Sequence, residues 1–306
     1  MHSNKLRYAG KNLGTLFCIL FAFAGISTIA LAGEDSQRPV DGIMDNSFLI
    51  EEAYNQEPGI VQHIFVGGYS VGRLSRPGDK TIDMVFTQEW PVYGQAHQLS
   101  YSLPYTFARE DGKWADGMGD MLVNYRYQAY FNESTLAAFA PRFSLVLPTG
   151  DEERGFGRGT LGYQWNLPFS TAVGDRIFAH ANAGLTYLPN AGAGPTHDFL
   201  NYNLGGSVIY CLSGSLHLML EWIGTWNETV ANSGKVNREF ASLISPGVRY
   251  AFNLRNGSQL VLGLGIPLGL TDSTSEIGGI FYLSFEHRLF GKEAAVEKGR
   301  AVELNR

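Results

Sequence analysis

The stretches LAAFAPRFSLVL, residues 136–147, and TLGYQWNLPF, residues 160–169, decide the fold. In the first stretch, every odd position from Ala137 to Leu147 is apolar, and the even positions include Arg142 and Ser144. The second stretch alternates in the same way between an aromatic or apolar side and a polar side. A period of two is typical of a β-strand with two different faces. With the charged, glycine-rich connection 148–159 between them, the stretches predict a long hairpin with one apolar face and one polar face.

The same alternation recurs along the rest of the chain. From residue 60 onward we expect twelve strands of about ten residues, the length that a tilted strand needs to cross a bilayer. Their predicted centres lie near Ile64, Phe86, Tyr101, Tyr125, Phe143, Trp165, Ala181, Leu204, Leu218, Val248, Leu262 and Leu283.

The connections between these strands alternate between long and short. Residues 72–80, 109–119, 148–159, 189–198 and 227–238 read as long connections, and residues 93–95, 132–134, 170–175, 212–214 and 253–258 as shorter ones. An up-and-down outer-membrane barrel has longer extracellular loops and short periplasmic turns, whereas a soluble sandwich does not sort its loops in this way. The sequence therefore predicts a 12-stranded antiparallel transmembrane β-barrel over residues 60–290, located in the cell outer membrane, with both ends on the periplasmic side.

Composition agrees with a barrel that faces lipid. Charged residues make up 17% of the chain, and glycine occurs 37 times, whereas a soluble domain has about 25% charged residues. Removing the three basic residues of the first 32 positions leaves 20 Lys and Arg against 29 Asp and Glu, a net charge of −9. This charge argues against nucleic acid as a partner.

Residues 1–32 read as a secretory signal, with a basic start, an apolar run from Leu13 and a small-residue cleavage site at 30–32. An uncleaved membrane anchor is the alternative, because the apolar run is long. Cys18 lies within this segment, so the mature chain keeps only Cys211 and has neither an intrachain disulfide nor a cysteine metal site. Residues 291–306 read as a charged periplasmic tail.

Residues 33–59 are acidic at first and show weak periodicity. Residues 45–47 are suited to capping a short helix over 48–54. We take the segment as a periplasmic lead-in, and a partial plug in the barrel mouth is the alternative.

Several motifs of residues 119–169 resemble a known family. They are Gly119-Asp120-Met121 at the start of a strand, Pro141-Arg142-Phe143, Leu147-Pro148-Thr149-Gly150-Asp151 and Gly159-Thr160. Over residues 60–290 the chain resembles the outer-membrane barrel family named after the meta-pathway of phenol degradation. The resemblance implies an outer-membrane protein that moves small, often hydrophobic or aromatic, compounds, and it supplies no catalytic residues. Such barrels commonly finish on an aromatic residue that the outer-membrane assembly machinery reads; Phe290 would hold that place, although the chain continues beyond it.

Charged and polar residues on the polar faces are candidates for the pore lining, because a charge at membrane depth must point to the lumen. These candidates are Arg126, Arg142, Gln164, Glu221, Arg249, Glu286 and Arg288. They would either orient a polar or anionic solute in an open pore or form ion pairs that brace a narrow, filled barrel.

Catalysis is not expected. The seven histidines do not cluster, and no Ser–His pair suited to an outer-membrane hydrolase is evident. No cofactor and no metal ion is implied. We expect a passive channel in the lipid bilayer for small-molecule solutes. A closed structural barrel and an outer-membrane hydrolase are the alternatives.

Overall fold

The computed structural model describes residues 46–72, 78–110, 112–192, 196–230, 235–254 and 257–289. All of them belong to the compact unit that spans residues 31–306. The predicted signal at residues 1–32, Phe290 and the predicted tail at residues 291–306 lie outside the described ranges.

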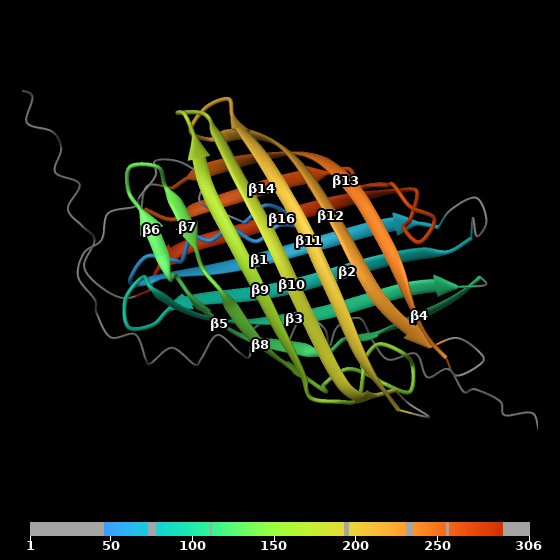
Figure 1. Cartoon of the computed structure of the whole chain (residues 1–306). Helices are drawn as coiled ribbons and strands as arrows, with labels where there is room; N and C mark the ends of the chain where they lie inside the picture. The colour runs from blue at the N-terminus through green and yellow to red at the C-terminus, as the bar shows by residue number, and fades with distance from the viewer. Residues whose placement is uncertain are drawn as a thin grey trace, which may run out of the picture. The chain divides into compact units, whose positions relative to one another are not determined.

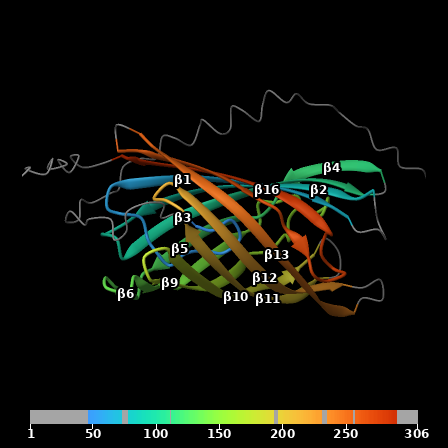
Figure 2. The ribbon, with the colours of Figure 1, turned by 90° about the horizontal axis from the view of Figure 1, so that it is seen from above.

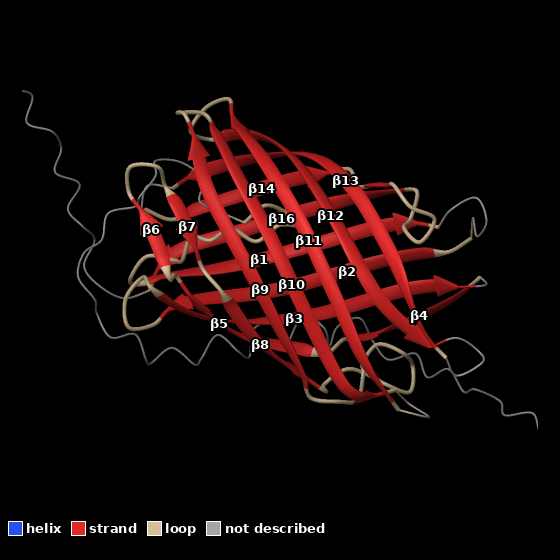
Figure 3. Ribbon diagram, in the orientation of Figure 1, coloured by secondary structure: helices blue, strands red, loops and turns tan. Residues whose placement is uncertain are grey.

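Apart from residues 46–59, the described residues form one antiparallel sheet of sixteen strands and the connections between them (Figure 3). The strands are β1 (Ile60–Val71), β2 (Lys80–Pro91), β3 (His97–Glu110), β4 (Lys113–Met118), β5 (Met121–Tyr127), β6 (Tyr130–Asn132), β7 (Ala137–Phe139), β8 (Arg142–Leu147), β9 (Gly162–Val173), β10 (Ile177–Ala191), β11 (His197–Cys211), β12 (Leu216–Val230), β13 (Val236–Asn253), β14 (Gln259–Gly265), β15 (Leu268–Gly269) and β16 (Ile277–Arg288).

Twelve of these strands close into a barrel (Figures 1 and 2). The ring runs β1, β2, β3, β5, β8, β9, β10, β11, β12, β13, β14, β16, and β16 pairs with β1 from Ile60↔Arg288 to Val71↔Ile277. The four remaining strands extend this ring: β4 pairs with β3, β7 pairs with β6 and β9, and β15 pairs with β13 and β16. The prediction of a 12-stranded antiparallel barrel is confirmed, and each predicted centre lies in one of the twelve ring strands.

Three of the connections predicted to be long are largely strand. Residues 109–119 mostly form β4, which returns along β3 with Trp114 opposite Arg109. β10 reaches Ala191, and β12 and β13 extend to Val230 and from Val236. Charged residues led to the prediction of loops here, but these residues pair across neighbouring strands. Arg238, for example, lies 2.6 Å from Glu228.

The two faces of the barrel differ as the alternation predicts. On β12, Leu218 and Leu220 point outward and are 44% and 49% exposed, whereas the inward His217 and Glu221 are 2% and 0% exposed. Large exposed apolar side chains cover the outside of the other strands in the same way. A continuous apolar exterior of this kind is suited to hydrocarbon rather than water. No helix among the described residues is long and apolar enough to cross a membrane.

Candidate functional site: the barrel lumen

Residues 46–59, which we call the lumen segment, lie inside the ring of strands. Ile50, Ala53 and Tyr54 are buried, and the segment contacts inward-facing side chains of many barrel strands. No helix forms over residues 48–54, so that expectation is wrong. Of the two interpretations of residues 33–59, these contacts favour a segment within the barrel for residues 46–59; residues 33–45 lie outside the described part of the chain.

Inward-facing side chains bind the backbone of the lumen segment. Glu221 on β12 accepts hydrogen bonds from the N–H groups of Leu49, at 2.8 Å, and Ile50, at 3.2 Å. Asn182 on β10 makes two bonds of 2.7 Å with Glu51, accepting from its N–H and donating to its carbonyl oxygen.

Further along the segment, Ser170 on β9 accepts from the N–H of Ala53, and Gln98 on β3 accepts from the N–H of Gln56, both at 2.8 Å. Buried backbone groups need partners. Here the barrel supplies them, which explains why the segment stays extended without a helix or sheet of its own.

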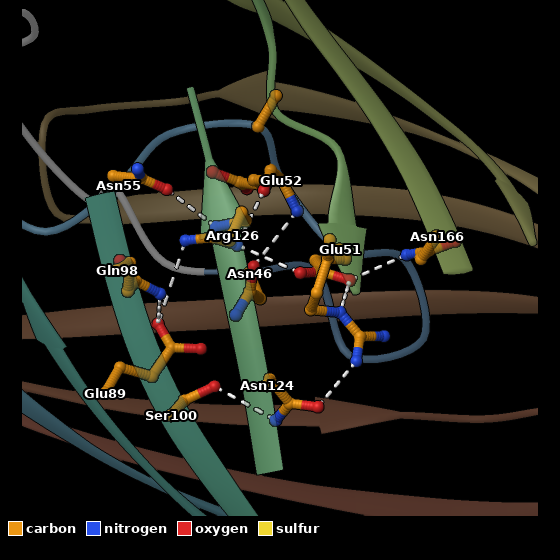
Figure 4. A network of polar contacts seen from close by, with 12 residues as sticks. Asn46, Glu51, Glu52, Asn55, Glu89, Gln98, Ser100, Asn124, Arg126 and Asn166 are labelled. Atoms are coloured by element: carbon orange, nitrogen blue, oxygen red, sulfur yellow. Dashed lines mark hydrogen bonds and ion pairs between the residues drawn. The ribbon is translucent and has the colours of Figure 1, made fainter. Parts of the chain in front are cut away.

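Arg126 on β5 is a predicted pore residue that binds the lumen segment through several hydrogen bonds. Its guanidinium donates to Asn55 Oδ1 at 2.7 Å, to Glu51 Oε1 at 3.1 Å and to the carbonyl oxygens of Glu52 and Tyr54 at 3.0 and 2.8 Å (Figure 4). The side chain is almost completely buried. Arg126 therefore holds the middle of the lumen segment by both charge and backbone recognition.

Arg142 on β8 binds the other oxygen of the same carboxylate. Its Nε lies 2.9 Å from Glu51 Oε2, and its remaining N–H groups donate to Asn124, Ser144 and Gln164. Asn166 donates a further hydrogen bond to Glu51 Oε2 at 2.6 Å. The two oxygens of the Glu51 carboxylate are thus each bound by one guanidinium group.

Arg249 on β13 reaches the start of the lumen segment. It donates to the carbonyl oxygen of Asn46 at 3.0 Å and lies 3.7 Å from Glu52 Oε1. Five of the seven predicted residues therefore surround the segment, since Glu221, Arg126, Arg142 and Arg249 contact it and Gln164 binds Arg142. Glu286 and Arg288 lie on the inner face of β16, opposite Gln62 and Ile60 of β1.

Glycines on the inner face form sockets for two apolar side chains of the segment. A Cβ atom at Gly263 would lie 2.4 Å from the ring of Phe48, and one at Gly247 would lie 2.8 Å from it. A Cβ at Gly205 would lie 2.4 Å from Ile50 Cδ1. These sockets were not predicted from the sequence, although a glycine at an inward position of a strand is the signal that could have suggested them.

A cavity of about 320 Å³ remains beside the lumen segment. The segment forms one wall through residues 46–51, and the opposite wall comes from β1, β2, β3, β5, β8 and β16. Its lining is apolar at Ile64, Val66, Val85, Pro104, Leu122 and Tyr282 and polar at Thr87, Glu89, Ser100, Ser102, Asn124 and Arg142.

One serine and one histidine come together inside the barrel. Ser170 Oγ lies 2.8 Å from His180 Nδ1, and His180 Nε2 lies 3.5 Å from Glu52 Oε1. All three side chains are buried, and Ser170 already accepts the N–H of Ala53. A nucleophile must be able to meet its substrate; this trio instead attaches the lumen segment to the barrel wall.

No protein-family model matches this sequence, and no curated protein matches it. Among solved structures, the chain is similar to an outer-membrane channel from Pseudomonas putida F1, with 15% identity and a TM-score of 0.60 over 76% of this chain and 97% of that one. A KdgM porin (12% identity, TM-score 0.38, covering 75% of this chain and 99% of that one) and a Pseudomonas aeruginosa FadL homologue (8% identity, TM-score 0.35, 76% and 89%) are more distant. The chain thus has the fold of outer-membrane channels.

Proposed function

We propose that this protein is an outer-membrane channel for small molecules whose lumen is partly filled by residues 46–59. The observation that carries the proposal is the combination of an apolar exterior, a polar interior and a remaining cavity of about 320 Å³ along one wall of the lumen. The lumen segment is bound closely on its other sides, whereas this space beside it is unfilled. We would expect a barrel with a purely structural role to be filled on all sides. Residues 1–32 then direct export to the outer membrane.

The lining of the cavity suggests the class of solute. Apolar and polar side chains share the lining of this space: Ile64, Val66 and Val85 are among the apolar ones, and Arg142 and Asn124 supply hydrogen-bonding groups. The charges of Arg142 and Arg126 are balanced locally by Glu51 and Glu89. A small solute with a hydrophobic or aromatic body and a hydrogen-bonding group fits this lining, in agreement with the resemblance to the phenol meta-pathway family.

Planar-bilayer recordings test the proposal with the purified full chain and a variant that lacks residues 46–57. We expect small discrete conductance steps for the full chain and a several-fold larger conductance for the variant. Because Arg142 lines the cavity and binds Glu51, Arg142→Leu should change the conductance or the anion preference.

An absence of conductance steps from both the full chain and a correctly folded deletion variant would favour the closed structural barrel instead. Unchanged values in Arg142→Leu would remove this residue from the solute path. Gln128→Leu is a suitable control, because it removes one 3.3 Å contact to the segment without touching the cavity lining.

A further inference from the structure

Two histidines meet on the outer face of the barrel where the ring closes. His63 on β1 and His287 on β16 belong to the first and the last strand of the ring, which pair along their whole length. Their Nε2 atoms lie 3.1 Å apart, and their ring planes are inclined by only 8°. Both side chains are half-buried, and they point outward because the neighbouring Ile64 and Glu286 are buried in the lumen.

The spacing of the two nitrogens matches a chelating pair. Imidazole nitrogens bind Zn²⁺ at about 2.0–2.1 Å, so two of them on one ion lie about 2.9 Å apart at a right angle and about 3.3 Å apart at a tetrahedral angle. The observed 3.1 Å lies between these values. Imidazole is a favoured ligand of Cu²⁺, Ni²⁺ and Zn²⁺.

A second layer of polar groups holds the pair in place. Gln88 Nε2 on β2 lies 3.2 Å from His63 Nδ1, and Tyr101 on β3 donates its hydroxyl to Gln88 Oε1 at 3.0 Å. Turning the amide by 180° lets Gln88 Oε1 accept the Nδ1 proton of His63 and lets the NH2 group of Gln88 donate to the Tyr101 hydroxyl. In that orientation the Nε2 lone pair of His63 is free for a metal ion, which is the usual arrangement around a metal-bound histidine.

The pair lies near the end of the barrel at which β1 starts. His63 is three residues from the start of β1, about 10 Å along the strand. Trp90 packs on Tyr101 beside it, and such aromatics are typical of the membrane–water interface.

We propose that His63 and His287 form a binding site for a divalent transition-metal ion on the outer face of the seam between β1 and β16. Water molecules would complete the coordination. The bound ion would join the first and last strands of the ring and stabilise the closed barrel, because a ligand that binds only the folded state shifts the unfolding equilibrium. The site depends on the barrel and not on conduction, so its failure would leave the channel proposal unaffected.

Copper titration of the full chain, purified in detergent micelles without a histidine tag, tests the site. Electron paramagnetic resonance and calorimetry should detect one Cu²⁺ per chain with nitrogen coordination. His63→Ala and His287→Ala should each raise the dissociation constant at least about tenfold, and Gln88→Leu about tenfold through the lost second layer. His97→Ala is the matched control and should bind as wild type, because His97, the first residue of β3, contacts Tyr125 and Tyr127 of β5.

Zn²⁺ provides a second measurement. It should raise the unfolding temperature of the wild-type barrel but not that of His287→Gln, a milder variant that keeps a polar side chain at the seam. Equal copper affinity in wild type and in His63→Ala, or the absence of zinc stabilisation in wild type, would overturn the proposal.

Discussion

The two sides of the lumen differ in what they are built to contact. Along β11 to β14, glycines 205, 247 and 263 receive Phe48 and Ile50, and Glu221 and Arg249 bind the backbone of the lumen segment. Along β1 to β3, side chains such as Val66, Val85 and Ser102 border the cavity, although Gln98 also binds the backbone of the segment at Gln56. The first wall is complementary to the protein's own chain, and the second borders the space that the proposed channel would offer to a solute. The binding of the lumen segment and the size of the cavity can therefore be altered by separate substitutions.

The largest expected effect comes from removing the cation that holds the middle of the segment. Arg126→Leu leaves Glu51, Asn55 and two carbonyl oxygens without this donor, and breaking a buried ion pair costs about 3–5 kcal/mol. We expect the segment to leave the lumen. The experiment uses Ala53→Cys in a chain with Cys18→Ser and Cys211→Ser. This cysteine should react with maleimide when Arg126→Leu is also present and should be protected when Arg126 is retained.

Arg238→Leu is the control for that labelling experiment, because Arg238 forms a surface ion pair with Glu228 outside the lumen. It should leave position 53 protected. If Arg126→Leu also leaves position 53 protected in a folded barrel, the segment is held mainly by its other contacts.

An intermediate effect should follow from filling a socket. Gly263→Val places a side chain where the ring of Phe48 lies, and overpacking of this kind costs about 1–3 kcal/mol. Conductance should rise, and Phe48→Ala in the same chain should reduce the steric conflict, as a double-mutant cycle can measure. Gly279→Val is the matched control, since a Cβ at Gly279 meets nothing within 4 Å; an equal response in both variants would contradict the socket.

The smallest effect on the segment should come from the opposite wall. Val85→Phe narrows the cavity without touching a residue that binds the segment. We expect conductance to fall by a few-fold, while maleimide protection at position 53 stays as in wild type. Met84→Phe, on the outward face of β2, should change neither value. A loss of protection in Val85→Phe would show that the two walls are not independent.

The barrel could be predicted from sequence because its rule is local. Alternation is visible within any ten residues, so all twelve strand centres and the inward direction of Arg126, Arg142 and Arg249 follow from neighbours in the chain. Strand ends were harder to predict. Beyond the lipid zone the apolar face is no longer required, and polar residues such as Glu228 and Arg238 continue the ladder.

The occupied lumen could not be predicted in the same way, because its contacts join distant parts of the chain. Arg126 is 75 residues from Glu51, and Arg249 is 203 residues from Asn46. The sequence around a carboxylate such as Glu51 does not indicate which residue will bind it. Likewise, Ser170 and His180 are neighbours only because of the register in which β9 and β10 pair. The role of the inward glycines could not be predicted either, because it depends on which side chain of the lumen segment fills the space beside each of them.

The lumen segment runs without a break into β1, and the carbonyl oxygen of Gly59 accepts the N–H of Leu289 just beyond β16. Closing the seam between β1 and β16 therefore also fixes the end of the lumen segment at Gly59. Contacts of such long sequence separation slow folding. Removal of the lumen segment should therefore change the rate at which the barrel refolds into detergent as well as the permeability of the folded barrel.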